Sequence, residues 1–160
     1  MLNRVSMRTH STPELIFRSN NMTGPMLRIG QKLVIAPADF SAVISTREKK
    51  LTLYNAKRFF KQYRLLAVPA ADAAQKGPPV KRVGKVVSKL ATDAAGNRVT
   101  FQDKGYAGAM HEVSLSIPGH SLFARPATEK PAARTGIALS PEDMEEIAVL
   151  LKKHDPVTIE

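Results

Sequence analysis

The stretch of sequence that decides the fold stands near the C-terminal end and reads Ala133-Arg134-Thr135-Gly136-Ile137-Ala138-Leu139-Ser140-Pro141-Glu142-Asp143. Ser140 is a favourable N-cap, Pro141 suits the first helical position, and the acidic residues that follow complement the positive end of the helix dipole. Apolar residues then recur at three- and four-residue spacing and predict a helix with one buried face: Met144, Ile147, Ala148 and Leu151. Pro156 prevents this helix from continuing.

Short alternating segments precede this stretch and predict an antiparallel β meander. Segments 40–45 and 50–54 flank a charged turn, and a second turn leads into segment 59–68. The Ala-, Gly- and Pro-rich residues 70–79 predict a surface loop. Further strands are predicted at residues 83–90, 98–102 and 112–116, with a hairpin tip at 95–97.

The C-terminal stretch resembles the closing segment of L,D-transpeptidases of the YkuD type. In that family the segment reads S-H-G-C-I-R-L-S, followed by an acidic helix and a short P-V-T-I strand, here Pro156-Val157-Thr158-Ile159. Gly136 falls at the cysteine position, Arg134 at the histidine position and Ala138 at the arginine position. The resemblance implies an α+β fold in which residues 39–160 form a mainly antiparallel β domain with a C-terminal helix and an edge strand.

The family's acyl-transfer chemistry needs a thiolate nucleophile, a histidine that takes its proton, and donors that hold the acyl intermediate. The chain contains no cysteine, so the resemblance implies a catalytically silent domain in which Arg134, Thr135, Gly136 and Ala138 are vestigial positions. A second family histidine falls near residues 122–125, which contain none, although His120 is close. An alternative is an atypical enzyme of the family that uses Ser121 or Thr135 as nucleophile.

The N-terminal residues 1–36 form a second predicted unit. Thr12, Pro13 and Glu14 stand in the order of an N-cap, a first helical residue and an acid near the helix start, and they predict a helix over residues 13–19. Asn20-Asn21 ends this helix, and residues 27–35 are predicted to form a strand that is entered through the turn Thr23-Gly24-Pro25.

This order resembles the last three-quarters of a LysM domain, a small β-α-α-β unit that binds N-acetylglucosamine-containing glycans. The matching residues are Thr12-Pro13-Glu14-Leu15, Ser19-Asn20-Asn21-Met22 and residues 28–35. The resemblance implies a glycan-binding loop made of Asn21, Met22, Thr23, Gly24 and Pro25. The chain begins where the family has its first helix, so the first strand is missing; either a start site lies upstream or the domain has decayed.

The net charge of +10 is concentrated in the first half of the chain, where 13 Lys and Arg stand against 4 Asp and Glu. Such a basic half favours a polyanionic partner: nucleic acid, anionic lipid or an acidic wall polymer. The run Lys57-Arg58-Phe59-Phe60-Lys61-Gln62-Tyr63-Arg64 interleaves cations with aromatic rings, as strand-based single-strand binders do. A nucleic-acid-binding β protein is therefore the main alternative class.

The sequence predicts neither a cofactor nor a metal, because the four histidines are scattered and no glycine-rich phosphate loop is present. No apolar stretch is long enough to span a bilayer, and the first residues lack the apolar run of a secretory signal. LysM followed by a YkuD domain is a cell-wall arrangement. The two resemblances together therefore predict a cell-envelope protein that binds peptidoglycan or its glycan strands, or scaffolds a cell-wall enzyme.

Overall fold

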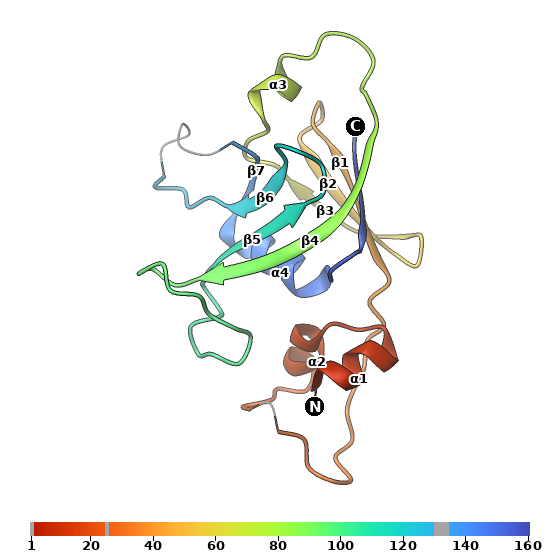
Figure 1. The fold of residues 1–160 in the computed structure, drawn as a ribbon, viewed down its shortest axis with the longest axis vertical. Helices are drawn as coiled ribbons and strands as arrows, with labels where there is room; N and C mark the ends of the chain where they lie inside the picture. The colour runs from red at the N-terminus through yellow and green to blue at the C-terminus, as the bar shows by residue number, and fades with distance from the viewer. Residues whose placement is uncertain (1, 25, 130–134) are drawn as a thin grey trace.

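The computed structural model describes residues 2–24, 26–129 and 135–160. Its body is a strongly twisted sheet, and two short helices at the N-terminal end lie beneath this body (Figure 1). These helices are α1 (Leu2–Thr9) and α2 (Pro13–Ser19). The predicted α+β class is confirmed.

The described residues form one eight-stranded sheet in the order β3-β2-β1-β8-β4-β5-β6-β7. The strands are β1 (Phe40–Ser45), β2 (Lys50–Asn55), β3 (Arg58–Arg64), β4 (Arg82–Thr92), β5 (Met110–Leu115), β6 (Ser121–Ala124), β7 (Ile137–Leu139) and β8 (Pro156–Ile159). Neighbouring strands are antiparallel except for the pairs β1–β8 and β6–β7, which are parallel. β4 is the longest strand and joins the two halves of the sheet.

Helix α4 (Pro141–Leu150) forms where the sequence predicts it and covers the inner face of the sheet. The Ser140 hydroxyl accepts a hydrogen bond from the Asp143 amide at 3.2 Å, which confirms the predicted N-cap. All four residues of the predicted apolar face are buried, and they pack with residues such as Ile44 and Leu122 in one core. Burial of this face therefore fixes α4 against both halves of the sheet.

The final strand is not at an edge, which corrects the expectation. β8 lies between β1 and β4, and Thr158 pairs with Val43 on one side and with Val83 on the other. The sequence of these four residues does not indicate whether the strand has one or two neighbouring strands in the sheet. Its hydrogen bonds go to strands more than 70 residues away in the sequence. The C-terminal segment thus closes the sheet.

The predicted strand over residues 27–35 is wrong. Arg28 and Gln31 form a tight turn, with Gly30 in the left-handed region at a φ of 80° and the Ile29 side chain fully exposed. The Val34 backbone is held by the Asn20 side chain, whose amide donates to Val34 O at 2.8 Å and accepts from Val34 N at 2.7 Å. A side-chain amide thus provides the hydrogen bonds that a neighbouring strand would give.

Two further expectations are corrected. Residues 98–102 do not form a strand, because the Asp103 carboxylate accepts from both Thr100 N and Thr100 Oγ1 and the Phe101 ring packs edge-on against Phe17. The loop predicted at 70–79 contains a short helix, α3 (Ala70–Ala73). The strands predicted at residues 40–45 and 156–159 are present with the predicted ends. The remaining predicted strands are present with shifted ends, and β3 stops at Arg64 instead of reaching Val68.

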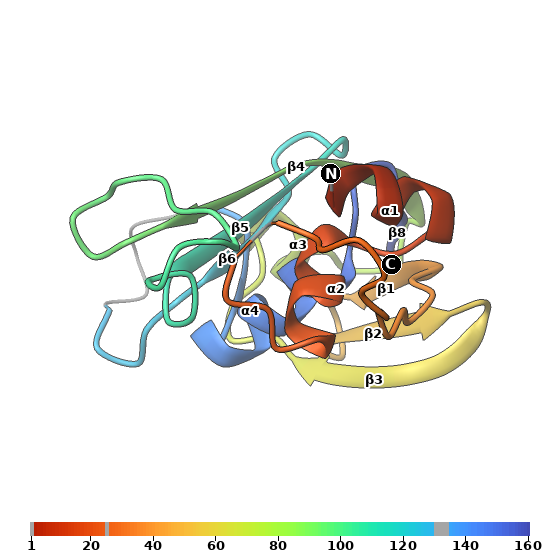
Figure 2. The same ribbon diagram turned by 90° about the horizontal axis from the view of Figure 1, so that it is seen from below.

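The N-terminal helices contact the rest of the molecule directly (Figure 2). The Thr12 hydroxyl caps α2 by accepting from Leu15 N at 3.0 Å and donates to Val149 O of α4 at 2.6 Å. Glu14 pairs with Lys89 of β4 at 2.9 Å, and Arg18 pairs with Glu145 of α4. Ile16 is fully buried at this contact.

Candidate functional site

Gly136 occupies a buried position at the start of β7, beside β6. Its φ of 141° lies in the region that disfavours L side chains. A Cβ built on Gly136 would lie 3.0 Å from the Ser121 carbonyl oxygen, 3.1 Å from Ser121 Oγ and 3.2 Å from the Phe123 ring. The space in which a nucleophile side chain would begin is therefore filled by β6.

The other positions that align with the family motif differ in their surroundings. Ala138 is fully buried, and its backbone pairs with the segment after β3, since Ala138 N donates to Ala67 O at 3.0 Å and Leu66 N donates to Ala138 O at 2.7 Å. Thr135 is exposed. Arg134 lies outside the described residues. The position predicted for the family arginine is thus buried between β6 and the segment after β3.

His120 is not directed toward a nucleophile but makes a buried hydrogen bond with a carboxylate. Its Nε2 lies 2.7 Å from Asp72 Oδ2, and its Nδ1 lies 2.8 Å from Pro118 O. Arg82 donates to the other Asp72 oxygen at 2.6 Å. Burial alone would raise the pKa of Asp72, but the His120 ring and the Arg82 guanidinium outweigh burial and hold this pKa below its ordinary value.

Asp72 was not foreseen as a partner of His120. It lies in an Ala-rich segment 48 residues from His120, and nothing local in the sequence pairs them. The interaction pins α3 to the start of β6 and to β4. His120 therefore acts here as a structural anchor.

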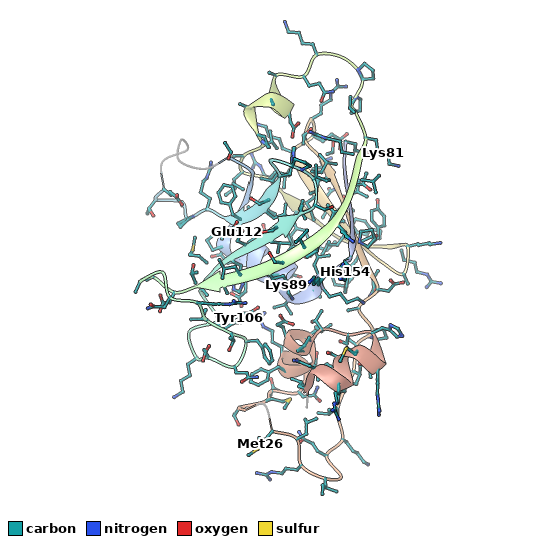
Figure 3. All side chains as sticks on the ribbon, viewed as in Figure 1. Met26, Lys81, Lys89, Tyr106, Glu112 and His154 are labelled. Carbon is teal, nitrogen blue, oxygen red and sulfur yellow. The ribbon has the colours of Figure 1, made fainter. Side chains whose placement is uncertain are left out.

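The predicted glycan loop lines a broad hollow at the N-terminal end of the molecule. Asn21, Met22, Thr23 and Gly24 all lie on its wall, together with residues 26–31, and its volume is about 920 Å³. Pro25 lies outside the described residues. Met26 lies beyond the helices on the side away from the sheet, and its side chain is 86% exposed (Figure 3).

Solved structures with the same arrangement of strands are known. No protein-family model and no curated protein sequence matches the chain. Bd1075 from Bdellovibrio bacteriovorus superposes with a TM-score of 0.53 at 14% identity, covering 77% of this chain and 48% of the other. An L,D-transpeptidase (Yku) from Stackebrandtia nassauensis gives a TM-score of 0.51 at 15% identity, with 76% and 55% covered. An L,D-transpeptidase from Mycobacterium tuberculosis H37Rv gives a TM-score of 0.51 at 17% identity, with 78% and 58% covered.

The chain has an L,D-transpeptidase-like fold. It spans about half the length of these three solved structures. At such identities the similarity establishes the fold, while function has to be argued from the site.

Within this fold, the basic–aromatic run of β3 does not present its rings on one face. Tyr63 is buried, Phe60 packs edge-on against Phe40 at 5.0 Å, and Phe59 is 66% exposed. Lys61 pairs with Glu146 of α4 at 2.5 Å. Single-strand binders stack successive bases on exposed rings. Of the three rings in this run, Phe59 and Phe60 (44%) are exposed and Tyr63 is buried, and Phe60 already packs against Phe40, so Phe59 is the ring left free to stack on a base. This arrangement weakens the nucleic-acid alternative.

The other histidines have separate surroundings. His111 is buried beside Tyr106, with Nε2 3.3 Å from Tyr106 O, and burial lowers the pKa of its ring below the ordinary value. Lys89 and Tyr106 lie between the sheet and the N-terminal helices (Figure 3).

Within residues 2–24, 26–129 and 135–160, no three His, Asp or Glu side chains gather as metal ligands would. None of the helices in these ranges has the length and apolar character needed to cross a membrane.

Proposed function

We propose that the protein is a non-catalytic peptidoglycan-binding protein of the cell envelope, built on an L,D-transpeptidase-like fold. The observation that carries this proposal is Gly136 at the expected nucleophile position. The Ser121 carbonyl oxygen lies 3.0 Å from where a Cβ would begin, and the chain contains no cysteine. A glycine supplies no group that attacks a carbonyl, so binding is the function left to this scaffold.

The hollow at the N-terminal end supports glycan binding. Met26 and Ile29 expose apolar surface on its wall, beside the side-chain amides of Asn21 and Gln31. Concave sites of this kind combine apolar surface with a few polar groups that fix orientation. A sugar ring has a matching apolar face and a rim of hydroxyls, and it is uncharged at most positions.

Retention on insoluble peptidoglycan at low and moderate salt tests the binding. Gly24 has no heavy atom within 4 Å of a built Cβ, so Gly24→Trp should fold normally while its ring fills the hollow. Gly105→Trp is the matched control, because its surroundings are equally open and it lies in a different exposed loop. We expect retention to survive moderate salt, to be lost in Gly24→Trp and to persist in Gly105→Trp.

Two results would contradict the proposal. A covalent carbapenem adduct, detected by intact mass, would reveal a nucleophile that the proposal denies. Strong binding of single-stranded DNA without retention on peptidoglycan would favour the nucleic-acid alternative. Binding to phosphates falls by orders of magnitude over a few-fold rise in salt, so the two salt conditions separate these ligands.

A further inference from the structure

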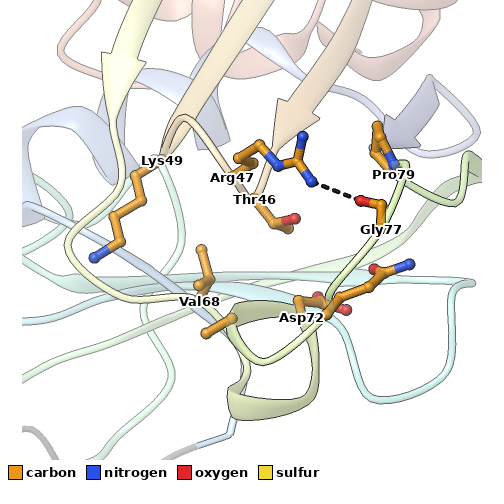
Figure 4. A pocket seen from close by; sticks show the side chains of 9 residues that line it. Thr46, Arg47, Lys49, Val68, Asp72, Gly77 and Pro79 are labelled. Carbon is orange, nitrogen blue, oxygen red and sulfur yellow. Dashed lines mark hydrogen bonds between the residues drawn. The ribbon is translucent and has the colours of Figure 1, made fainter.

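A second cleft lies at the opposite end of the molecule from the N-terminal hollow, and it has a different chemical character. It has a volume of about 310 Å³ and is enclosed by two segments, the turn between β1 and β2 and residues 68–79 around α3 (Figure 4). Thr46, Arg47 and Lys49 come from the turn. This volume is at the lower end of the range of small-molecule sites, about 300–1,000 Å³.

The wall that carries α3 is fixed in place by Asp72. Its carboxylate bonds to His120 and Arg82 at 2.7 and 2.6 Å, and its side chain is almost fully buried. Across the mouth of the cleft, an Arg47 guanidinium nitrogen donates to Gly77 O at 2.6 Å (Figure 4). Two independent contacts therefore hold residues 68–79 over the turn, and the cleft is formed before any ligand arrives.

The cleft carries positive charge that the described part of the chain does not compensate. Lys49 has no ion-pair partner there, and Arg47, which carries five N–H donors, makes one hydrogen bond within that part, to Gly77 O. Glu48, the acid between them in the sequence, pairs with Lys50 at 3.2 Å. Asp72 is already bonded to His120 and Arg82. An anion that enters the cleft therefore meets the Arg47 guanidinium, whose remaining donors are available, while the Lys49 ammonium points away from Arg47 and adds positive charge at the edge of the cleft (Figure 4).

The rest of the lining favours an organic anion over a bare inorganic one. Val68, Ala73 and Pro79 contribute apolar surface, and Gln75 contributes a side-chain amide. Inorganic phosphate would leave the apolar surface unused. A carboxylate attached to a short apolar group would place its charge against Arg47 and its hydrocarbon part against Val68, Ala73 and Pro79.

We propose that this cleft binds a small carboxylic acid with a short apolar part, with Arg47 as the group that holds the carboxylate and Lys49 adding positive charge at the edge of the cleft. The site shares no residue with the N-terminal hollow. It is therefore independent of glycan binding, and either function can fail without the other.

The test is a titration of the full chain with N-acetylalanine, followed by the NMR signals of the Thr46 and Gln75 amides. N-acetylalaninamide is the matched ligand control, because it has nearly the same shape without the charge. We expect the acid to bind at least tenfold more tightly than the amide, and Arg47→Gln and Lys49→Gln each to weaken it by about tenfold, which corresponds to ~1.4 kcal/mol. Lys57→Gln is the protein control, because Lys57 is equally exposed and also has a positive φ, in the turn between β2 and β3.

Three results would overturn the proposal: equal binding of the acid and the amide, equal loss of binding in the Lys57 and Lys49 variants, and no shift of either amide signal up to tens of millimolar acid. Phosphate that binds as tightly as N-acetylalanine would also overturn it, since the apolar wall would then contribute nothing. The D and L forms are titrated separately. Binding of either form supports the site if Arg47→Gln and Lys49→Gln weaken it and Lys57→Gln does not. Retention of the Arg47 variant on peptidoglycan is a separate measurement that tests the glycan proposal.

Discussion

At the scale of single residues, the surroundings of Gly136 leave little room for any side chain. Its backbone angle and the contacts of its missing Cβ both disfavour a side chain. Ser121 and Phe123 occupy the neighbouring space, so a side chain at this position would require them to move.

A cysteine introduced at Gly136 should therefore cost stability, and we expect it to form no acyl adduct. We expect Gly136→Cys to lower the free energy of unfolding by about 1–3 kcal/mol, through backbone strain and overpacking against Ser121. Gly105→Cys, at an open position, should stay within about 0.5 kcal/mol of the parent chain. Urea unfolding measures both variants. A Gly136→Cys protein that keeps full stability and forms a carbapenem adduct would show that the site remains open.

Asp155 is a buried acid at the turn between α4 and β8, and it gives the protein a pH dependence. Burial raises the pKa of Asp155 to about 6, against the partial offset of the Lys152 amide, which donates to Oδ2 at 2.9 Å. An acid whose pKa is higher in the folded state binds protons more tightly there. Its contribution to stability therefore falls as the pH rises from about 4 to 6.

Asp155→Asn should remove this dependence. The amide oxygen still accepts from Lys152 N, and no charge is buried, so we expect the variant to be more stable than the parent by about 1–3 kcal/mol at pH 7 and little different at pH 4. Glu129→Gln, an exposed acid, serves as control. Unfolding curves at both pH values provide the measurement. If Asp155→Asn were less stable than the parent at pH 7, the negative charge of Asp155 would stabilise the folded state.

At the scale of elements, the segment after α2 shows how one side chain replaces a strand. The Asn20 amide makes three hydrogen bonds, one to Ile16 O at 2.8 Å and two to the Val34 backbone. These bonds hold residue 34 beside the end of α2. They therefore fix both ends of the loop that lines the N-terminal hollow.

Asn20→Ala should release this loop. We expect a loss of about 1–2 kcal/mol in unfolding free energy, rapid hydrogen exchange at the Val34 amide, and weaker retention on peptidoglycan. Asn21→Gly is the control for the exchange measurement, because glycine tolerates the φ of 47° at that position and no hydrogen bond to Val34 is removed. Unchanged protection of Val34 in Asn20→Ala would mean that the loop is held by other contacts.

The elements also show what the sequence could predict. The caps at Thr12 and Ser140 and the apolar face of α4 depend on neighbours within four residues, and all three predictions are confirmed. The prediction of a strand at residues 27–35 is wrong because the local sequence can indicate a segment that is able to pair. It does not indicate whether a neighbouring strand is present to pair with it. The place of β8 and the Asp72–His120 pair depend on contacts between distant segments, which no local pattern reports. Four of the five predicted glycan residues line one hollow, and their ligand stays a prediction.

At the scale of the whole molecule, the predicted N-terminal unit is joined to the β domain by more than the chain. Its contacts reach both α4 and β4, through Thr12, Glu14 and Arg18. The Thr12 hydroxyl has two roles, since it caps α2 and bonds to α4 at a fully buried position. A change at Thr12 therefore reports on how strongly the two parts depend on each other.

We expect Thr12→Ala to destabilise both parts together, by about 2–3 kcal/mol. The change removes an N-cap, which contributes about 0.5–2 kcal/mol, and leaves the buried Val149 carbonyl without its Thr12 donor, which costs about 1–3 kcal/mol. Thr23→Ala, on an exposed residue of the N-terminal loop, should have almost no effect. Hydrogen exchange under mildly destabilising urea can follow the amides of α2 and of the central strands β1 and β8 separately. Equal losses in both sets indicate that the helices and the sheet unfold as one cooperative unit, so that a ligand in the N-terminal hollow would also stabilise the sheet. A loss confined to α2 would instead show that the helices open independently, and binding in the hollow would then leave the β domain unaffected.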